Sequence, residues 1–311
     1  MIVAPGQGSQ KPGLLADWLT LDGAADAITA DSEAAGLDLA ELGTTGDEAT
    51  ITDTAHAQPL LVALALLAGR AVLDGGPPAD VYAGHSVGEL TAVGLAGILG
   101  PVEAVGLAAR RGREMAAASA LEATGLSAVV GGEAPDVEAA VAAAGLQIAN
   151  HNGAGQIVAG GRRDRLAELP QHLPKRSRAV PLAVAGAFHT RFMAPAVPAM
   201  ASAVDALVPG DPVAVVLSNL DGGAATSGAD LLARLVLQVT HAVRWDRCQA
   251  ALRRLGVTGL LELPPAKALT NIAKRDLPGV ERFALNTTDQ LGEARSFCAS
   301  HAGPHPQETR P

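Results

Sequence analysis

The sequence predicts an α/β fold in two parts: a large part built on a parallel sheet, and a smaller part of ferredoxin-like order inserted into it. Apolar segments of strand length alternate with helical segments before residue 120 and again after residue 187, which is typical of a parallel sheet covered by helices. Between these stretches the segments follow the ferredoxin-like order β-α-β-β-α-β. The chain of 311 residues is long enough for one large domain or two smaller ones.

The large part begins with a short apolar strand, residues 2–4, which runs into a Pro-Gly turn. Its other predicted strands cover residues 80–83, 214–217 and 259–263. Its predicted helices cover residues 60–73, 89–99, 104–118, 229–237 and 247–255.

The inserted part has its own set of predicted elements. Its strands cover residues 126–130, 146–149, 156–159 and 178–184, and its helices cover residues 136–144 and 162–169. We therefore expect a large catalytic α/β subdomain from residues 1–120 and 187–300, and an inserted subdomain from residues 121–186. Residues 301–311, HAGPHPQETRP, have few apolar side chains and no periodicity, and we expect a flexible tail there.

The composition is that of a globular protein, with 48% apolar and 18% charged residues. Aromatic residues make up only 2%, so Ala, Leu and Val must fill the core. The net charge of −9 disfavours nucleic acid and anionic membranes as partners, because both attract cationic proteins. Cys248 and Cys298 lie 50 residues apart, without a CxxC motif or a His at ligand spacing, which predicts two reduced thiols and no metal site.

The sequence predicts no targeting segment. The N-terminal residues MIVAPGQG lack a basic region, which predicts no signal peptide. The longest apolar run, residues 59–69, ends at Arg70 and is shorter than the roughly 20 residues that span a membrane. We therefore expect a cytoplasmic protein that does not associate with membranes, and a monomer as the simplest assembly.

The stretch VYAGHSVGEL contains the pattern G-x-S-x-G around Ser86. With 35 glycines in the chain the pattern can arise by chance, so its context decides. A predicted strand precedes it and a predicted helix with Glu89 in its first turn follows, which is the setting of a nucleophile elbow. Gly84 and Gly88 would leave room for the tight turn, and the N–H of Val87 would face a developing oxyanion. The alternative is a glycine-rich loop in which Ser86 only caps the helix.

A serine nucleophile needs a general base, and the chain has eight histidines. His189 is the best placed of them, because it follows a predicted strand and a small-residue turn, and the sites of α/β proteins lie at the ends of strands. An imidazole can take the proton of a hydroxyl and return it to a leaving group near neutral pH. The alternative is a buried or capping histidine without a catalytic role.

Ten motifs occur along the chain in the order found in one enzyme family. They are PGQGSQ (5–10), AQPLL (57–61), GHSVGE (84–89), RRGREM (110–115), ATGLSAVVGG (123–132), ANHNGAGQIVAG (149–160), VAGAFHTRFMAPA (184–196), SNLDG (218–222), QVTHAVRW (238–245) and PPAKALTNIAKR (264–275). With these motifs the chain resembles the malonyl-CoA:acyl-carrier-protein transacylases of bacterial fatty-acid synthesis and, more distantly, the acyltransferase domains of polyketide synthases. The resemblance extends to about residue 285 and implies an α/β-hydrolase-like large subdomain with a ferredoxin-like insert. The sequence departs from the family at 264–266, where Pro-Pro-Ala replaces the Gly-Pro-Gly of many relatives.

The resemblance also implies roles for single residues. Ser86 would be the nucleophile that accepts the acyl group, and His189 would be its general base. The backbone carbonyl of Gln238 would orient the imidazole in place of a carboxylate, so that the Gln238 side chain should matter less than its C=O. The backbone N–H groups of Gln7 and Val87 would form the oxyanion hole.

Substrate binding is assigned by the same resemblance. The guanidinium of Arg111 would hold the malonyl carboxylate by two parallel hydrogen bonds, and acetyl-CoA, which lacks the carboxylate, would be rejected. Phe188 and Val87 resemble the versions of the family that select malonyl over methylmalonyl groups. Three further residues would shape the pocket or form hydrogen bonds in it: Gln58, Asn150 and Asn152.

The implied reaction is a ping-pong transfer of malonyl from CoA through Ser86 to the phosphopantetheine thiol of acyl carrier protein, with no metal or redox cofactor. Carrier proteins of this type are acidic, as is this chain, so docking would need a local basic patch. The candidates are Arg162, Arg163, Arg165, Lys175, Arg176, Arg178, Lys274 and Arg275. Two other functions remain open, a stand-alone acyltransferase of a polyketide synthase and a serine thioesterase or hydrolase. A non-catalytic module that binds carrier protein is disfavoured, since it would need none of Ser86, His189 and Arg111.

Overall fold

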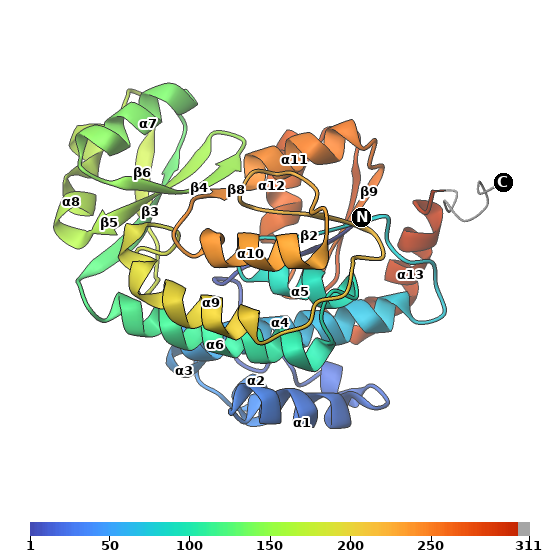
Figure 1. Cartoon of the computed structure of the whole chain (residues 1–311). Coiled ribbons are helices and arrows are strands. Elements are labelled where there is room, and N and C mark those ends of the chain that lie inside the picture. Colours follow the sequence, from blue (N-terminus) through green and yellow to red (C-terminus); the bar gives the residue numbers. More distant parts are fainter. Residues whose placement is uncertain (304–311) are drawn as a thin grey trace.

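The structure is a computed structural model that describes residues 1–303, and it contains two five-stranded sheets (Figure 1). The first sheet is parallel throughout and has the strand order β10-β9-β1-β2-β7. Its strands are β1 (Ile2–Ala4), β2 (Val81–Gly84), β7 (Val215–Leu217), β9 (Gly259–Glu262) and β10 (Glu281–Ala284). The predicted α/β fold with a parallel sheet is confirmed.

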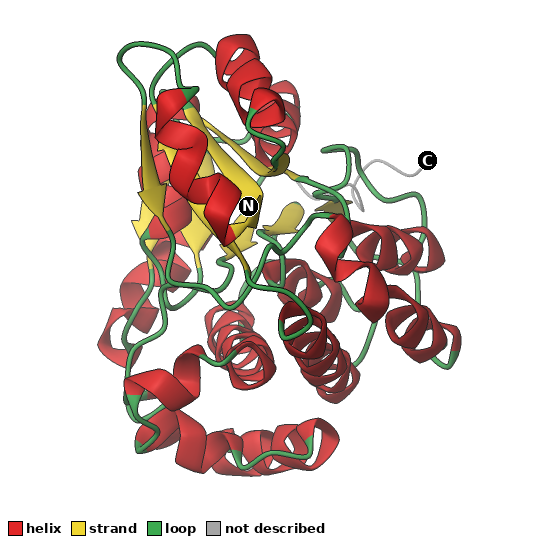
Figure 2. Ribbon diagram, turned by 90° about the vertical axis from the view of Figure 1, so that its left-hand side faces the viewer, coloured by secondary structure: helices red, strands yellow, loops and turns green. Residues whose placement is uncertain are grey.

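The second sheet has the order β6-β3-β5-β4-β8 and is antiparallel except for the pair β4–β8. Its strands are β3 (Thr124–Val130), β4 (Gln147–Gly153), β5 (Gln156–Arg162), β6 (Arg178–Pro181) and β8 (Val243–Arg244). Figure 2 shows its long strands side by side, with helices packed against them. With α7 (Ala134–Ala143) and α8 (Arg163–Glu168), the element order is the predicted β-α-β-β-α-β. Strand β8 was not predicted, and it comes from a much later part of the chain.

The other helices pack around the first sheet: α1 to α4, α6 and α9 lie in the lower half of the molecule in Figure 1, whereas α11 and α12 lie in its upper half. The α-helices are α1 (Ala24–Ala35), α2 (Leu39–Thr44), α3 (Glu48–Thr52), α4 (Thr54–Leu73), α5 (Gly88–Leu95), α6 (Pro101–Ser119), α9 (Val197–Asp205), α10 (Gly228–Gln238), α11 (Trp245–Arg254), α12 (Ala268–Asp276) and α13 (Leu291–Ser300). Short 3-10 helices lie at Trp18–Thr20, Leu169–Gln171, Arg191–Ala196 and Thr288–Gln290.

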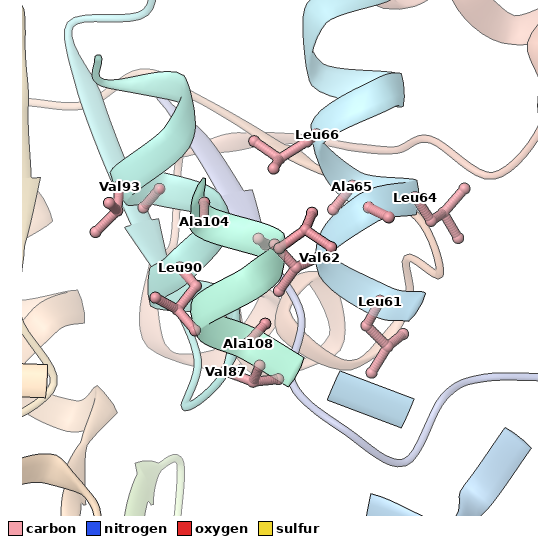
Figure 3. Close-up of a cluster of buried hydrophobic side chains, with 14 of the residues drawn as sticks. Leu61, Val62, Leu64, Ala65, Leu66, Val87, Leu90, Val93, Ala104 and Ala108 are labelled. Atoms are coloured by element: carbon pink, nitrogen blue, oxygen red, sulfur yellow. The ribbon is translucent and has the colours of Figure 1, made fainter. Parts of the chain in front are cut away.

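Helix α4 forms the centre of the main core and packs against α5 and α6. Figure 3 shows its apolar side chains next to those of the two other helices. The labelled residues are Leu61, Val62, Leu64, Ala65 and Leu66 from α4, Val87, Leu90 and Val93 from the Ser86 turn and α5, and Ala104 and Ala108 from α6. By length and composition α4 could cross a membrane, but most of it is buried inside the protein, as expected for a core helix.

Several helices begin or end at other residues in the structure than predicted. The helix predicted at 60–73 begins at Thr54, because the Asp53 side chain accepts a hydrogen bond from the N–H of Ala55 and caps it. The helix predicted at 89–99 ends at Leu95, shortly before Gly97, whose φ is 74°. Helices α1 to α3, α9, α12 and α13 and strand β10 were not predicted.

The predicted flexible tail lies mostly outside the described residues, which end at 303. Its first residue, His301, is held by the structure: its Nδ1 lies 3.0 Å from Oγ1 of Thr258. Its ring also lies 4.6 Å, centroid to centroid, from that of Phe297. The end of α13 therefore packs against the start of β9 in the first sheet.

Candidate active site

Ser86 lies in the turn between β2 and α5, at the carboxyl end of the strand. Its φ is 56°, in the left-handed region that residues other than glycine seldom adopt. The turn is closely packed on both sides: a Cβ on Gly84 would overlap the carbonyl of Gly88, and a Cβ on Gly88 would overlap the carbonyl of Ala4. Both positions therefore require glycine, and the G-x-S-x-G pattern follows from the packing of this turn.

The side chains of Ser86 and His189 meet although they are far apart in the sequence. Nε2 of His189 lies 2.7 Å from Oγ of Ser86, and Nδ1 lies 2.9 Å from the backbone oxygen of Gln238. When Nδ1–H donates to this carbonyl, Nε2 is free to accept the hydroxyl proton of Ser86. Within residues 1–303 no carboxylate lies at hydrogen-bond distance from the imidazole.

The loop that carries His189 is anchored to the second sheet. The backbone N–H of Ala187 donates to Oγ1 of Thr124 at 3.1 Å, and His189 itself has a φ of 61°. The side chain is buried, with 4% of its surface exposed. Burial, and after it the positive charge of Arg111, lowers the pKa of His189 to about 3. The imidazole is therefore neutral at physiological pH, which is the form that can accept a proton.

Two backbone N–H groups beside Ser86 can accommodate negative charge. Gln7 and Val87 line the same cleft as Ser86 and His189, and in the part of the chain that the structure describes their N–H groups have no acceptor. Val87 is the N-cap of α5, where the helix dipole favours an anion. Gln7 is fixed by its side-chain amide, which donates to Oγ1 of Thr54 at 3.3 Å. Such donors are suited to an oxyanion.

Helix α6 carries two neighbouring arginines that point in different directions. Arg110 is exposed and forms an ion pair with Glu114, with 3.0 Å between Nε and Oε1. Arg111 is 1% exposed, and its Nη2 lies 3.4 Å from Oγ of Ser86. The structure therefore places Arg111, and not Arg110, beneath the serine.

The guanidinium of Arg111 is held by two amides. Nη1 donates to Oε1 of Gln58 at 2.7 Å, and Nη2 donates to Oε1 of Gln238 at 2.8 Å. Burial lowers the pKa of Arg111 to about 10, and the nearby Glu89 opposes this shift. The group thus remains cationic at neutral pH. Because its direct partners are neutral amides, its charge is available to an anionic ligand.

Buried polar residues under the turn, which were not predicted from the sequence, hold it in place. Asn219, in the loop after β7, accepts a hydrogen bond from the N–H of Ser86 at 2.7 Å and donates to the oxygen of Gly84 at 2.7 Å. Glu89 is fully buried and accepts from the N–H of Asn219 at 2.7 Å. Both residues stand in motifs of the family resemblance, Glu89 in GHSVGE and Asn219 in SNLDG, and these motifs are the only sign in the sequence that the two residues belong to the site. The Gln238 side chain, which we expected to matter less than its carbonyl, bonds directly to Arg111.

The cleft above Ser86 lies between the two sheets and has a volume of about 300 Å³. Phe188, 6% exposed, lines it next to His189, and β4 contributes Asn150 and Asn152. His85, next to Ser86 in the turn, bonds to Asn152 instead of to the Ser86–His189 pair, and its Nε2 lies 2.9 Å from Oδ1 of Asn152. All ten residues named in the sequence analysis as site residues lie in this cleft or directly beneath it: Gln7, Gln58, Ser86, Val87, Arg111, Asn150, Asn152, Phe188, His189 and Gln238.

Comparison with known proteins identifies the class of enzyme. Residues 1–279 match the family described as acyl transferase domain, so the chain is an acyltransferase. A malonyl CoA-acyl carrier protein transacylase of Mycobacterium tuberculosis is 50% identical over 297 residues, covering 94% of this chain and 98% of the relative. The chain belongs to the acyl transferase family and, within it, to the malonyl CoA-acyl carrier protein transacylases.

Solved structures of this family share the fold. The crystal structure of the M. tuberculosis protein superposes with a TM-score of 0.90 at 49% identity, covering 95% of this chain and all of that one. A malonyl-transacylase solved in complex with its type II polyketide-synthase acyl-carrier protein also gives a TM-score of 0.90, at 29% identity and with coverage of 95% and 98%.

Proposed function

We propose that this chain transfers a malonyl group from CoA to the phosphopantetheine thiol of acyl carrier protein, through an ester on Ser86. The names of its relatives support the reaction. The observation on which the proposal depends most is the buried cation of Arg111 next to the Ser86–His189 pair, because it would join a nucleophile to a site for the carboxylate of the substrate.

In the first half-reaction the hydroxyl of Ser86 attacks the thioester carbonyl of malonyl-CoA. Its proton moves to Nε2 of His189, and the N–H groups of Gln7 and Val87 stabilise the oxyanion of the tetrahedral intermediate. The C–S bond then breaks. The CoA sulfur leaves with the proton from Nε2, and the malonyl group remains as an ester on Ser86.

The second half-reaction runs the same steps with another thiol. The phosphopantetheine thiol of the carrier gives its proton to Nε2 of His189, and its sulfur attacks the ester carbonyl. The C–O bond to Ser86 breaks, and the serine oxygen recovers the proton. The cleft between the two sheets helps to keep water away from the ester.

Two residues of the site would select the acyl-CoA: Arg111 beneath the cleft and Phe188 in its lining. Arg111 would pair with the malonyl carboxylate, and each charged hydrogen bond of this kind contributes roughly 1.5–3 kcal/mol. Acetyl-CoA would leave the buried cation unpaired. The ring of Phe188 would disfavour an α-methyl group, for which discrimination by a pocket is limited to about 1–3 kcal/mol. Gln58 fixes Arg111, and Asn150 and Asn152 provide polar groups on the opposite wall.

The first experiment is the intact mass of the protein after brief exposure to malonyl-CoA, methylmalonyl-CoA or acetyl-CoA, with Ser86→Ala as the control. One malonyl group that is added from malonyl-CoA alone and is absent in the variant would support both the nucleophile and the carboxylate selection. Rapid release of CoA without an adduct would instead indicate a hydrolase. Equal adducts from all three donors would refute the role of Arg111 and keep that of Ser86.

We place the docking surface for the carrier protein on the inserted part, between α8 and β6. Arg162 and Arg165 are exposed there but pair with carboxylates, Arg162 with Asp164 and Arg165 with Glu168. In the described residues Arg163, Lys175, Arg176 and Arg178 are exposed and form no ion pair, so they would supply the positive charge. Lys274 and Arg275, at the end of α12, are a second and smaller group.

Charge reversal tests this docking surface. The double variant Arg163→Glu with Lys175→Glu should raise the apparent KM for carrier protein and leave the rate of malonylation by malonyl-CoA unchanged. Arg282→Glu, on the edge strand β10, is the matched control for a lost surface cation. An unchanged KM in the double variant would refute this location.

The identity of the carrier remains a choice between two. We propose the carrier of fatty-acid synthesis, in line with the family resemblance. The polyketide alternative is supported by the solved complex of a related transacylase with a type II polyketide-synthase carrier. Comparing kcat/KM for the two holo-carriers from the same organism distinguishes them. We further propose a cytoplasmic monomer, consistent with exposed large apolar residues that come from different parts of the chain, such as Leu121, Val208 and Leu255.

A further inference from the structure

One carboxylate, that of Glu89, connects the elements that carry the candidate site. Glu89 lies in the first turn of α5 and is fully buried. Its Oε1 accepts from the backbone N–H of Asn219 at 2.7 Å, and its Oε2 accepts from Nε2 of Gln238. The side chain of Glu89 bonds to neither the base, the nucleophile nor the guanidinium, so the steps described above do not use it. Only its backbone N–H contacts the nucleophile, by donating to the backbone oxygen of Ser86 at 3.1 Å.

The amide of Gln238 has only one favourable orientation in these surroundings. Its Nε2 faces three acceptors: the carboxylate of Glu89, the backbone oxygen of Ser86 at 3.3 Å and Oδ1 of Asn219 at 3.4 Å. Its Oε1 faces the donor Nη2 of Arg111 at 2.8 Å. A flipped amide would set oxygen against three oxygens and nitrogen against nitrogen. The contacts of Nε2 with Ser86 and Asn219, at 3.3 and 3.4 Å, are at the long end of hydrogen-bond distances. Glu89 therefore contributes most to fixing the orientation of the amide.

The second oxygen of Glu89 acts on the other side of the site. By accepting from the N–H of Asn219, it holds the loop after β7, and the Asn219 side chain in turn bonds the N–H of Ser86 and the oxygen of Gly84. In this hydrogen-bond network, Gln238 is the single residue between the Glu89 side chain and Arg111. Asn219 is the single residue between the Glu89 side chain and the N–H of Ser86.

Building on the proposed function, we propose that Glu89 is a positioning residue for malonyl transfer: it orients the side-chain amide of Gln238, and through that amide it holds the Arg111 guanidinium where the substrate carboxylate binds. The backbone carbonyl of Gln238 orients His189, so a single glutamine serves the base with its main chain and the carboxylate site with its side chain.

Glu89 places little negative charge next to the substrate carboxylate at neutral pH. Burial raises the pKa of Glu89 to about 8, although the N–H of Asn219 and the charge of Arg111 oppose the shift. In the described residues no carboxylate oxygen lies within 4.0 Å of the Arg111 guanidinium, because the Gln238 amide stands between it and Glu89. The guanidinium is thereby oriented by Glu89 without a direct ion pair that would compete with the substrate.

A double-mutant cycle with Glu89→Gln and Gln238→Ala tests the proposal. The wild-type chain is measured first for malonylation of Ser86, and if it takes no malonyl group, the proposed function itself is wrong. If it does, Glu89→Gln should lower kcat/KM for malonyl-CoA about tenfold or more, because the new amide cannot accept from both the N–H of Asn219 and Nε2 of Gln238 and leaves one buried donor unpaired. It should lower the much slower reaction with acetyl-CoA less, since acetyl-CoA does not use Arg111.

The decisive comparison is the Gln238→Ala background, where the backbone carbonyl that holds His189 is kept. There, Glu89→Gln should change kcat/KM for malonyl-CoA less than twofold, because its connection to Arg111 is already lost. Additive effects, an equal fall with malonyl-CoA and acetyl-CoA, or no effect of Glu89→Gln would overturn the proposal. Glu262→Gln, which removes another fully buried carboxylate, should leave the malonyl-to-acetyl ratio unchanged. If circular dichroism shows that Glu89→Gln is unfolded, Glu89→Asp, too short to reach both partners, replaces it in the same cycle.

Discussion

Arg110 and Arg111 are adjacent in the sequence, yet the first is a solvated ion-pair partner of Glu114 and the second is buried beneath Ser86. The helix rotates by about 100° per residue, so α6 directs one side chain to the solvent and the next into the protein. Their side chains have the same chemistry and differ only in the face of the helix that they occupy, which makes each a control for the other.

Arg111→Ala should slow malonylation of Ser86 about 10- to 100-fold and leave the slower reaction with acetyl-CoA much less affected, because only malonyl has a carboxylate to bind. Arg110→Ala should behave as the wild type in both reactions. The measurement is the rate of acyl-enzyme formation by quenched-flow mass spectrometry with each donor. Arg111→Lys should recover part of the rate, since an ammonium cannot form two parallel bonds. Equal losses with both donors would contradict the assigned role.

The low pKa of His189 predicts an unusual pH profile. The neutral imidazole is the active form, and its pKa is lowered from 6.5 to about 3 by burial and by Arg111. As the pH falls, the base is therefore protonated only far below the usual range. The rate of Ser86 malonylation should stay nearly constant between about pH 8 and pH 5, instead of falling about tenfold per unit below 6.5. A rate that is halved near pH 6.5 would refute this prediction.

Removing the base is the companion experiment. His189→Ala should reduce the rate of acyl-enzyme formation by roughly 10² to 10⁴. His241→Ala is the matched control, because His241 is exposed and lies beyond the end of α10. A variant of His189 that retains most of its rate would show that another group accepts the proton.

The turn around Ser86 should tolerate no side chain at Gly84. A Cβ there would overlap the backbone of Gly88, which cannot move without displacing α5, so Gly84→Ala should cost more than about 3 kcal/mol in the free energy of unfolding. Gly292→Ala, in α13, meets nothing within 4 Å and should be neutral or stabilising by up to about 1 kcal/mol. Urea denaturation of the two variants checks this, and a stable Gly84→Ala protein would contradict the packing described here.

Glu89 should make folding stability depend on pH. Its pKa is raised from 4.5 to about 8 in the folded chain, so the folded state keeps a proton that the unfolded state has lost. The contribution of Glu89 to the free energy of unfolding is therefore complete below about pH 4.5 and is lost as the pH rises to about 8. The slope is at most about 1.4 kcal/mol per pH unit. In Glu89→Gln this part of the slope should disappear.

The groups that face Glu89 leave a clear pH window for this measurement. His85 and His189 have lowered pKa values, Arg111 titrates at about 10 and the pKa of Cys248 is raised well above 9. Urea unfolding of wild type and Glu89→Gln between pH 6.5 and 8 therefore isolates Glu89. Parallel stability curves for the two proteins in this window would show that Glu89 is already ionised.

The fold could be predicted because its strongest signals are local. Alternation of strands and helices gave the parallel sheet, and the β-α-β-β-α-β order of the insert gave the second sheet. Helices α1 to α3 were missed for two reasons: the apolar residues of α1 are alanines except for Ile28, which gives a weak periodic signal, and α2 and α3 have only 6 and 5 residues. Strand β8 has only two residues and exists through its partner β4, which no local pattern reveals.

The site was predictable to the extent that its residues stand in recognisable motifs. Ser86 is defined by its turn, and His189 by its place after a strand and by the family resemblance. Glu89 could not be identified as a network residue, because its neighbours Asn219 and Gln238 are more than 100 residues away and only the fold brings them together. A buried glutamate and a helix-capping glutamate look the same in a sequence.

Strand β8 means that the second sheet does not belong to one continuous stretch of the chain. Four of its strands lie between Thr124 and Pro181. The fifth, Val243–Arg244, follows the loops of Ser86 and His189 in the sequence and pairs with Asn150 and His151. Exchange of residues 121–186 between two members of the family would therefore join a donor sheet to the edge strand of the recipient. We therefore expect a chimera that also exchanges the segment around β8 to keep the side-chain contacts at this edge of the sheet, which an exchange of residues 121–186 alone would mix between the two parents.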